Sequence, residues 1–387
     1  MKKIIFNIFN LIEKVIPKTN IIIFNSFPDY SDNSYALFKY MLENNYDKRY
    51  KIVWLVTNRN PKILGNEIKN EFNKNIKCYK KNSILGFYFY FRAFKVFCTH
   101  GIFSFIKVKN NKKINLWHGM PLKTIGFLDE KYKNKEKVYN QDYLISTSIL
   151  FQEIMAEAFK EEKGKVLLTG QPRNDLFFEK SNFFIKRKID KNKYKKIFLW
   201  MPTYRQSIVG DIRIDGEIKN NYLGMIPFEN IKGINNLLKE KKYLLIIKIH
   251  PMDILNKINL EEYSNIIILK INDLENINEQ LYPLLASTDA LITDYSSVWI
   301  DYEILDKPIF FAIHDYEEYK NTRGLLFEDF IDISPYPVME NYEEFKKFIE
   351  NYEEIDINNR KFTDKYNKYK DNKSCERIIK FLELNKI

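Results

Sequence analysis

Short apolar runs alternate with longer amphipathic stretches along most of this chain. From residue 18 onwards the alternation predicts α/β layers with largely parallel sheets, because each strand is followed by a helical crossover to the next. In the first half the predicted strands are Ile21–Asn25, Lys51–Thr57, Val96–Thr99, Ile114–Trp117, Tyr143–Ser146 and Val166–Thr169. The predicted helices of this half include Tyr35–Glu43, Ser83–Phe94 and Ile149–Phe159.

The second half repeats the alternation after a charged segment near residues 179–196. Its predicted strands are Ile197–Met201, Tyr243–Ile249, Asn265–Leu269, Ala290–Thr293 and Pro308–Ala312. Its predicted helices are Phe228–Glu240, Asn278–Ala286, Ser297–Leu305, Tyr342–Tyr352 and one near Phe362–Leu384. We therefore divide the chain into a helix at 1–18, an N-terminal domain at 19–185, a second domain at 186–360 and a C-terminal helix at 361–387. Two such α/β halves place a ligand cleft between the carboxyl ends of their strands.

The first 17 residues have a pattern of their own. Four polar residues fall on one helical face with an apolar surface opposite, namely Asn7, Asn10, Glu13 and Lys14. The stretch is too short and too polar to span a bilayer, which takes about 20 apolar residues. Either the helix lies in a membrane interface with the help of nearby lysines, or it packs on the protein's own core. Those lysines are Lys2, Lys3, Lys14 and Lys18.

Composition narrows the classes of partner. The chain has 387 residues, of which 45% are hydrophobic and 29% are charged, as in a folded protein of two domains. The formal net charge of +11 indicates a polyanionic partner, such as nucleic acid, an anionic membrane face or a phosphorylated substrate. No basic helix with spaced aromatics and no RNA-binding signature occurs, so we expect no nucleic acid partner.

Metal and cofactor chemistry finds little support in the sequence. Three cysteines without CxxC spacing argue against a disulfide framework and against a cysteine metal site. No Walker A loop, dinucleotide-binding glycine motif or acidic pair at a strand end occurs, so we expect no metal and no cofactor.

Polar motifs follow several predicted strands. His118, in Trp117-His118-Gly119, is a candidate general base, because a histidine can take the proton from an attacking alcohol. Gly119 would let the backbone approach a ligand, and Lys123 could meet a phosphate. The alternative for His118 is a strand-end histidine bonded to a local carbonyl.

The second half carries comparable motifs. His250, in Lys248-Ile249-His250-Pro251, could as an imidazolium stabilise charge on a leaving phosphate, or could be structural. Thr203 and Arg205 follow the first strand of this half, and the Arg205 guanidinium could clamp a diphosphate through two hydrogen bonds. Arg173 lies on a turn near the domain junction, where it either binds a ligand or pairs with Asp175.

The segment Thr293–Val298 is an apolar run that breaks into a polar turn before a helix. Ser296 and Ser297 are predicted to bind phosphate and to cap that helix. Asp294 would orient the turn or accept a hydrogen bond from a sugar hydroxyl. The carboxylates of Asp301 and Glu303 either reach ribose hydroxyls or form a solvated helical face. Two further histidines, His100 and His314, are predicted to be structural or surface residues.

Taken in order, these motifs resemble the CDP-glycerol glycerophosphotransferase family, which includes the teichoic-acid glycerol and ribitol phosphate primases and polymerases. The resemblance runs from about residue 20 to 340. It rests on Trp117–Lys123, Gly170–Asp175, Met201–Arg205, Lys248–Pro251, Thr293–Val298 and Tyr319–Phe327. Two positions depart from the family pattern, Met120 and the turn at 334–337.

The resemblance implies a GT-B-like fold of two Rossmann-like domains with parallel sheets facing a central cleft. The N-terminal domain would lie on the acceptor side, and the second would bind the CDP donor. It implies transfer of a polyol phosphate from a CDP-polyol, most simply CDP-glycerol, to a hydroxyl of a lipid-linked acceptor, with release of CMP. By position, His118 is the base, His250 assists the pyrophosphate, and Arg205, Ser296, Ser297 and Arg323 bind donor phosphates or cytidine.

The resemblance also implies a peripheral protein on the cytoplasmic face of the cell membrane, in contact with its anionic surface. Two other functions stay open from the residues alone. One is a GT-B glycosyltransferase that uses a sugar nucleotide, and the other is a non-catalytic module that binds an anionic polymer or lipid. The sequence does not determine whether the polyol is glycerol or ribitol, or which acceptor is used. It also leaves open whether one unit or many are added and what the oligomeric state is.

Overall fold

The computed structural model describes residues 2–106, 112–129, 140–205, 221–250, 253, 255, 262–270, 272–327, 334, 336–357 and 365–384. The chain divides into two compact units. Unit 1 comprises residues 1–120, 126–176 and 371–387, and unit 2 comprises residues 121–125 and 177–370. The division after Leu176 lies ahead of the predicted one after residue 185. The charged segment that was expected to link the halves belongs to unit 2, where Phe183 is fully buried and Lys186 binds Glu279.

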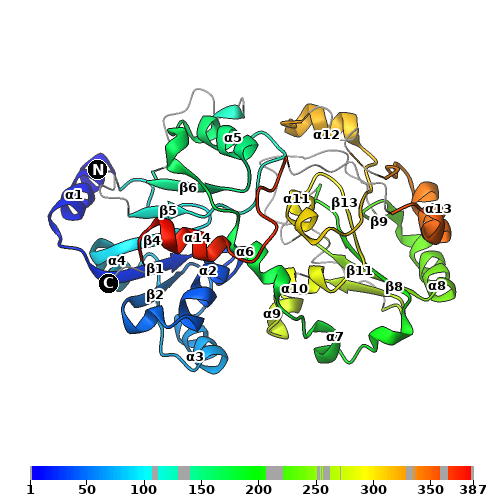
Figure 1. Ribbon diagram of the computed structural model, residues 1–387, viewed down its shortest axis with the longest axis horizontal. Helices are drawn as coiled ribbons and strands as arrows, with labels where there is room; N and C mark the ends of the chain where they lie inside the picture. Colours follow the sequence, from blue (N-terminus) through cyan, green and yellow to red (C-terminus); the bar gives the residue numbers. More distant parts are fainter. Residues whose placement is uncertain are drawn as a thin grey trace. The chain divides into compact units, whose positions relative to one another are not determined.

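Unit 1 is built on a seven-stranded parallel sheet (Figure 1). Its strands are β1 Thr19–Asn25, β2 Lys51–Val56, β3 Lys77–Lys80, β4 Ala93–Cys98, β5 Lys113–Asn115, β6 Tyr143–Ser146 and β7 Val166–Leu168. The order is β3-β2-β1-β4-β5-β6-β7, and every pairing is parallel. In β1 the residues from Ile21 to Asn25 are all buried, as expected for a parallel strand covered on both faces.

Seven helices accompany this sheet in the described residues of unit 1. They are α1 Lys2–Val15, α2 Asp32–Glu43, α3 Pro61–Phe72, α4 Ile84–Arg92, α5 Ile149–Phe159, α6 Pro172–Asp175 and α14 Ser374–Phe381. Local sequence explains several of their ends. The Ser148 hydroxyl accepts a hydrogen bond from the Phe151 N–H at the start of α5, and the Asn60 side chain caps α3 ahead of Pro61.

The C-terminal helix is shorter than predicted and belongs to unit 1. It begins at Ser374 rather than near residue 362. Residues 365–373 are not helical, and residues 362–364 lie outside the described part. The Asp175 carboxylate of unit 1 accepts hydrogen bonds from the backbone N–H groups of Ser374 and Cys375, at 2.9 and 2.8 Å. This cap ties the last helix, red in Figure 1, to α6 of the same unit.

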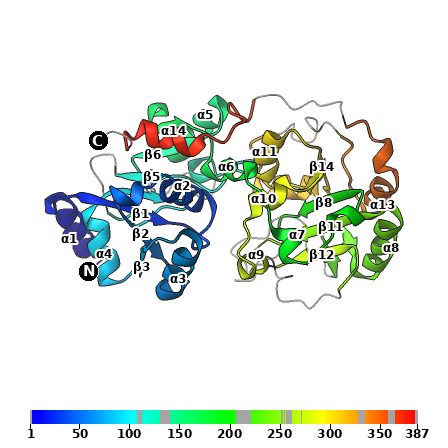
Figure 2. The same ribbon diagram turned by 60° about the horizontal axis from the view of Figure 1, so that its bottom comes forward.

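Helix α1 packs beside α4 at the edge of unit 1 (Figure 2). Phe9 contacts the rings of Phe87 and Phe91, so one face of α1 covers the core. This agrees with the alternative in which the helix packs on the protein's own core. Glu13 was expected on the polar face, yet it is only 5% exposed. It is buried because Lys112, itself 1% exposed, lies 2.9 Å from one of its carboxylate oxygens.

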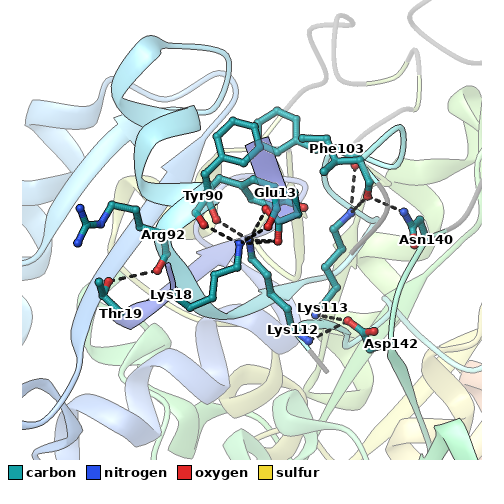
Figure 3. Close-up of polar contacts among 12 residues, drawn as sticks. Glu13, Lys18, Thr19, Tyr90, Arg92, Phe103, Lys112, Lys113, Asn140 and Asp142 are labelled. Carbon is teal, nitrogen blue, oxygen red and sulfur yellow. Dashed lines mark hydrogen bonds and ion pairs between the residues drawn. The ribbon is translucent and has the colours of Figure 1, made fainter. Parts of the chain in front are cut away.

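Figure 3 shows the polar network around that carboxylate. Lys112 Nζ also donates to the Tyr90 carbonyl at 2.6 Å, and Lys18 Nζ binds Glu13 at 2.8 Å. Lys18 therefore neutralises a buried acid, whereas one of the two alternatives from the sequence placed it at a membrane surface. A buried carboxylate needs such partners, since an isolated charge in the interior is unstable. The network fixes α1 against the strand that leads to His118.

Unit 2 contains a five-stranded parallel sheet and a short hairpin. The sheet order is β12-β11-β8-β13-β14, with β8 Lys196–Met201, β11 Tyr243–Lys248, β12 Ile266–Leu269, β13 Ala290–Thr293 and β14 Ile309–Phe311. The hairpin consists of β9 Tyr222–Leu223 and β10 Ile226–Pro227. Its Gly224 approaches the Trp200 ring so closely, at a φ of +61°, that a side chain there would clash.

The described helices of unit 2 lie between and after these strands. They are α7 Phe183–Lys186, α8 Ile231–Lys241, α9 Asp273–Asn276, α10 Leu281–Ala286, α11 Val298–Tyr302, α12 Tyr316–Arg323 and α13 Tyr342–Asn351. Helices α8 and α13 lie side by side in both views (Figures 1 and 2). Their aromatic and aliphatic side chains pack with those of the sheet in one core. Across both units, none of the described helices is long and apolar enough to cross a membrane.

Candidate functional site

His118 sits on a turn that leaves the carboxyl end of β5. Trp117 has a φ of +52°, and Gly119 has a φ of +132°. A left-handed conformation is costly for a residue with a large side chain, so surrounding contacts must hold Trp117 there. The Trp117 ring lies 4.3 Å from the His118 imidazole, centroid to centroid, and the backbone N–H of Trp117 donates to Asn115 Oδ1 at 3.0 Å.

Asn33 is the residue that holds this turn. It is fully buried at the start of α2, and its Nδ2 donates to the carbonyls of Leu116 and Trp117 at 2.9 and 3.0 Å. Its Oδ1 accepts the backbone N–H of Arg173 at 3.0 Å. Asn33 was not predicted as a site residue from the sequence. The available signal was an amide at the helix start that follows β1, which by itself predicts only a helix end.

Arg173 also supports the turn. Its Nη1 donates to the His118 carbonyl at 2.8 Å and to Asp32 Oδ1 at 2.9 Å. The predicted alternative of a pair with Asp175 is wrong, because Asp175 is engaged in capping α14. With 7% of its surface exposed, Arg173 positions the backbone of the candidate base.

The environment of His118 sets its protonation state. Burial lowers the pKa of His118 to about 3, with further contributions from the positive charge that His100 can carry and from Arg173. The imidazole is therefore neutral near pH 7, as a general base must be before it takes a proton.

A second group of predicted site residues lies in unit 2, where β8, β13 and β14 end beside one another. Thr203 donates to the Asp294 carboxylate through its backbone N–H at 3.0 Å and through its hydroxyl at 2.8 Å. Asp294 is 3% exposed, so it orients the two loops and is not presented to a sugar hydroxyl.

Arg205 joins three of these strand ends. Its Nε and Nη2 donate to the two oxygens of Asp315 at 2.7 and 3.0 Å, and Nη2 lies 3.3 Å from Asp294. Its guanidinium lies over the rings of Tyr295 and Tyr319, at 5.3 and 4.9 Å from their centroids. The two-bond clamp predicted for a diphosphate is thus made to Asp315, a carboxylate that the sequence gave no reason to place there.

The serine turn is more open. Ser296 and Ser297 are partly exposed. The predicted cap is wrong for Ser297, whose side chain makes no hydrogen bond to α11, whereas Ser296 Oγ accepts the Val298 N–H at 3.4 Å. Asp301 and Glu303 on the following turns are buried instead, where they accept hydrogen bonds from Tyr282 and Asn367. Both alternatives for these two carboxylates, ribose ligands and a solvated face, are therefore wrong.

Lys123 follows His118 by only five residues, yet it belongs to unit 2. The strand bridge between Lys123 and Leu325, together with the bond from Arg323 Nη1 to the Thr124 carbonyl at 3.1 Å, attaches this segment to the end of α12. Lys123 Nζ lies 5.1 Å from the centroid of the Tyr319 ring. Lys123 and Arg323 are consequently joined to the aromatic pair that supports Arg205.

His250 stands near this cluster. Its ring lies 4.7 Å from that of Tyr204. Burial, together with the charges of Lys123 and Lys248, lowers the pKa of His250 to about 3. The imidazolium expected from the sequence is thus not the form present near pH 7 in this structure. A phosphate dianion bound beside the ring would raise its pKa, because an opposite charge favours the protonated form.

Comparison with known proteins decides the family. The family model described as CDP-Glycerol:Poly(glycerophosphate) glycerophosphotransferase matches residues 6–384. The chain belongs to that family. It is a transferase of the glycerophosphotransferase type, with the expected α/β fold of two Rossmann-like, GT-B-like domains.

Several curated relatives are similar to this chain over most or nearly all of its length. A teichoic acid poly(glycerol phosphate) polymerase of Bacillus spizizenii is 30% identical over 98% of this chain and 95% of its own length. A teichoic acid glycerol-phosphate primase of Bacillus subtilis is also 30% identical, over 75% of this chain and 73% of its own. A solved structure of the wall teichoic acid polymerase TagF, from a variant soaked with CDPG, matches with a TM-score of 0.74 and 25% identity, over 98% of this chain and 92% of that one.

Among the described residues of this family member, no group of three or more His, Cys, Asp and Glu side chains is arranged to hold a metal ion. The charges near the two histidines come from lysine, arginine and paired carboxylates. The glycerophosphotransferase motifs thus divide into two groups, one around His118 in unit 1 and one around Arg205, Lys123 and His250 in unit 2.

We predict that Asp315→Ala destabilises this glycerophosphotransferase. The substitution leaves the Arg205 guanidinium, whose side chain is 11% exposed, without its two-bond partner. Loss of one member of a buried ion pair typically costs about 3–5 kcal/mol in the free energy of unfolding. Urea unfolding measures that loss. The control is Glu153→Ala, which removes an ion pair whose side chains are 59% and 51% exposed and should cost less than about 1 kcal/mol. Equal effects of the two substitutions would contradict the prediction.

Proposed function

We propose that this protein transfers a polyol phosphate, most simply glycerol phosphate, from a CDP-polyol to a hydroxyl of a membrane- or lipid-linked acceptor, with release of CMP. The reaction would serve the synthesis of a teichoic-acid or capsule-like polymer. Family membership over residues 6–384 supports the reaction type, and the names of the polymerase and primase relatives support the class of substrate. The soak of TagF with CDPG supports a CDP-glycerol donor.

The observation that carries the proposal most directly is the His118 turn. A strained backbone at Trp117, held by a buried Asn33 and by Arg173, presents an imidazole that is neutral near pH 7. In the proposed step this imidazole takes the proton of the acceptor hydroxyl. The hydroxyl oxygen forms a bond to the β-phosphorus of the donor, and the bond between that phosphorus and the bridging oxygen breaks, so that CMP leaves.

Unit 2 would hold the donor. Lys123, Arg323 and the turn at Ser296 and Ser297 supply positive charge and hydroxyls for the diphosphate. His250 would gain a proton as the negative charge arrives, and could pass it to the departing CMP oxygen. Arg205 acts indirectly, because its contacts with Asp315 and Asp294 fix the loops that carry these groups.

The test is a donor panel. Purified protein is incubated with CDP-glycerol, CDP-ribitol, UDP-sugars and CMP-sialic acid, each with a lipid-linked saccharide or polyol-phosphate acceptor. Released nucleotide and product mass are then measured. CMP release with a mass gain of one or more glycerol phosphates supports the proposal, and the number of units distinguishes single addition from polymerisation. UDP release would favour a glycosyltransferase, and no release with any donor would favour a binding module. We also propose that the reaction needs no metal ion. The assay is therefore repeated with EDTA, and loss of activity would contradict this proposal.

We further propose that the protein attaches peripherally to the cytoplasmic face of the membrane through α1. The face of α1 next to its core contacts exposes Ile8, Leu11 and Val15 by 51%, 61% and 67%. Spacings of three and four residues place them in one helical stripe. Ile84 on the neighbouring helix α4 is 90% exposed. Such a stripe can enter the boundary between headgroups and acyl chains, where the basic chain is attracted to anionic lipid.

We predict that replacing Ile8, Leu11 and Val15 together by serine weakens binding to vesicles that contain anionic phospholipid. The expected loss is about tenfold or more, because each buried CH₂ group contributes about 0.8 kcal/mol. Vesicle sedimentation measures it. The matched control replaces three other exposed isoleucines by serine, at Ile63, Ile149 and Ile185. Vesicle binding that is unchanged in the first variant, or equally weakened in the control, would refute the role of α1.

A further inference from the structure

His100 lies against the candidate base although 18 residues of sequence separate them. It follows β4 in the segment Thr99-His100-Gly101, and β4 pairs in parallel with β5, the strand that leads to His118. Both chains leave the sheet at the same edge. The imidazole centroids of His100 and His118 are 4.2 Å apart, and the ring planes differ by only 11°. The two rings are therefore stacked face to face.

The orientation of the His100 ring is fixed by its own neighbours. Its Nδ1 lies 2.9 Å from the Thr99 hydroxyl oxygen, and that oxygen accepts the backbone N–H of Phe27 at 3.2 Å. The Phe27 ring meets the imidazole edge-on at 5.6 Å. His100 is nevertheless an exposed residue, so solvent can supply or remove its proton.

We propose that His100 is a second functional residue of the His118 site, in which its stacked ring fixes the plane of the base and binds the first proton of the pair in place of that base. The inference rests on the proposed role of His118 and names His100 as a positioning residue for it.

The physical reason is repulsion between two imidazolium ions in face-to-face contact. Two groups so close titrate as a pair, and the second proton is bound far less readily than the first. The charged groups around the pair are Asp32 from α2 and Arg173 from α6. Although the residue as a whole is exposed, desolvation of its stacked ring lowers the pKa of His100, and Asp32 opposes that shift. Arg173 adds to the depression of the pKa of His118. The first proton therefore goes to exposed His100, and His118 keeps its lone pair for the acceptor hydroxyl.

The first experiment observes the pair directly and needs no turnover. The chain has only four histidines, so their ring resonances in a ¹³C-histidine sample can be assigned from single substitutions. We compare wild type with His100→Phe, which keeps a stacked ring without a titrating group, and with His100→Gln in case the phenylalanine variant folds poorly. The control is His314→Phe in unit 2. We expect the titration midpoint of His118 to rise by about one pH unit in both His100 variants and to stay unchanged in the control.

The second experiment measures the pH profile of kcat/KM for CMP release from CDP-glycerol. We expect the acid limb to move to higher pH in the His100 variants by the same amount as the His118 midpoint, with KM for CDP-glycerol unchanged. A uniform loss of kcat at all pH values, with no movement of the limb, would show a merely structural role. An unchanged His118 midpoint would overturn the inference whether or not CDP-glycerol is turned over. A shifted midpoint in a protein that releases no CMP would instead overturn the proposed function and leave the pairing standing.

Discussion

Replacing His118 with glutamine is expected to reduce CMP release by about 10²–10⁴-fold, the usual contribution of a general base. Glutamine can still form a hydrogen bond but cannot accept the proton of the acceptor hydroxyl. Because the pKa of His118 is lowered to about 3, its neutral fraction does not change near pH 6.5, where a free imidazole titrates. The deficit should therefore be nearly constant between pH 6 and 8. Initial rates with CDP-glycerol and acceptor provide the measurement.

The control for this substitution is donor binding. His118 belongs to unit 1, whereas Lys123, Arg323 and the serine turn belong to unit 2. The His118→Gln protein should therefore bind CDP-glycerol as wild type does by calorimetry, and should unfold at the same temperature. Wild-type turnover in a folded His118→Gln protein would remove the basis for assigning it as the base.

The second large effect is expected at His250. His250→Ala should lose turnover by about 10²-fold or more, the scale found when one group that stabilises developing charge is removed. In contrast to His118→Gln, this variant should also bind CDP-glycerol more weakly. The lost imidazole lies in unit 2 beside Tyr204, and it is close enough to Lys123 for the lysine charge to lower its pKa. Binding calorimetry and CMP release together test both parts.

A companion substitution separates the two contributions of this imidazole. His250→Gln keeps a hydrogen-bond donor and should recover much of the donor affinity, yet it cannot transfer a proton and should not recover turnover. The assigned role would be wrong if the alanine variant bound and turned over CDP-glycerol normally, or if glutamine restored full activity.

The order of strands and helices was largely predictable from local patterns. Tyr143–Ser146, Ala290–Thr293 and the helix Ile149–Phe159 have their predicted bounds. Strand β3 and helices α3 and α12 were not predicted. β3 has a lysine at each end and two half-buried residues between them, and α12 is polar along most of its length. These two elements therefore lack the apolar periodicity on which such predictions depend.

The site residues divide in a similar way. His118 and His250 could be proposed from sequence, because each directly follows an apolar strand and carries a titratable ring at its end. The residues that contact these motifs and fix their geometry could not be proposed from the sequence. Asn33 lies in the first turn of α2, after β1, and Asp315 lies just before α12, after β14. Only the parallel pairing of β1, β4 and β5, and of β8, β13 and β14, brings them to the motifs.

What the sequence by itself determined is the alternation of strands and helices, the family and the two candidate histidines, since these depend on local periodicity and on the order of short motifs. Tertiary structure alone decided which charges are neutralised. It paired Arg205 with Asp315, buried Glu13 against Lys112, and stacked His100 on His118. The reason is physical: the free energy of a charge depends on its burial and on partners within a few ångströms, and those partners come from residues far away in sequence.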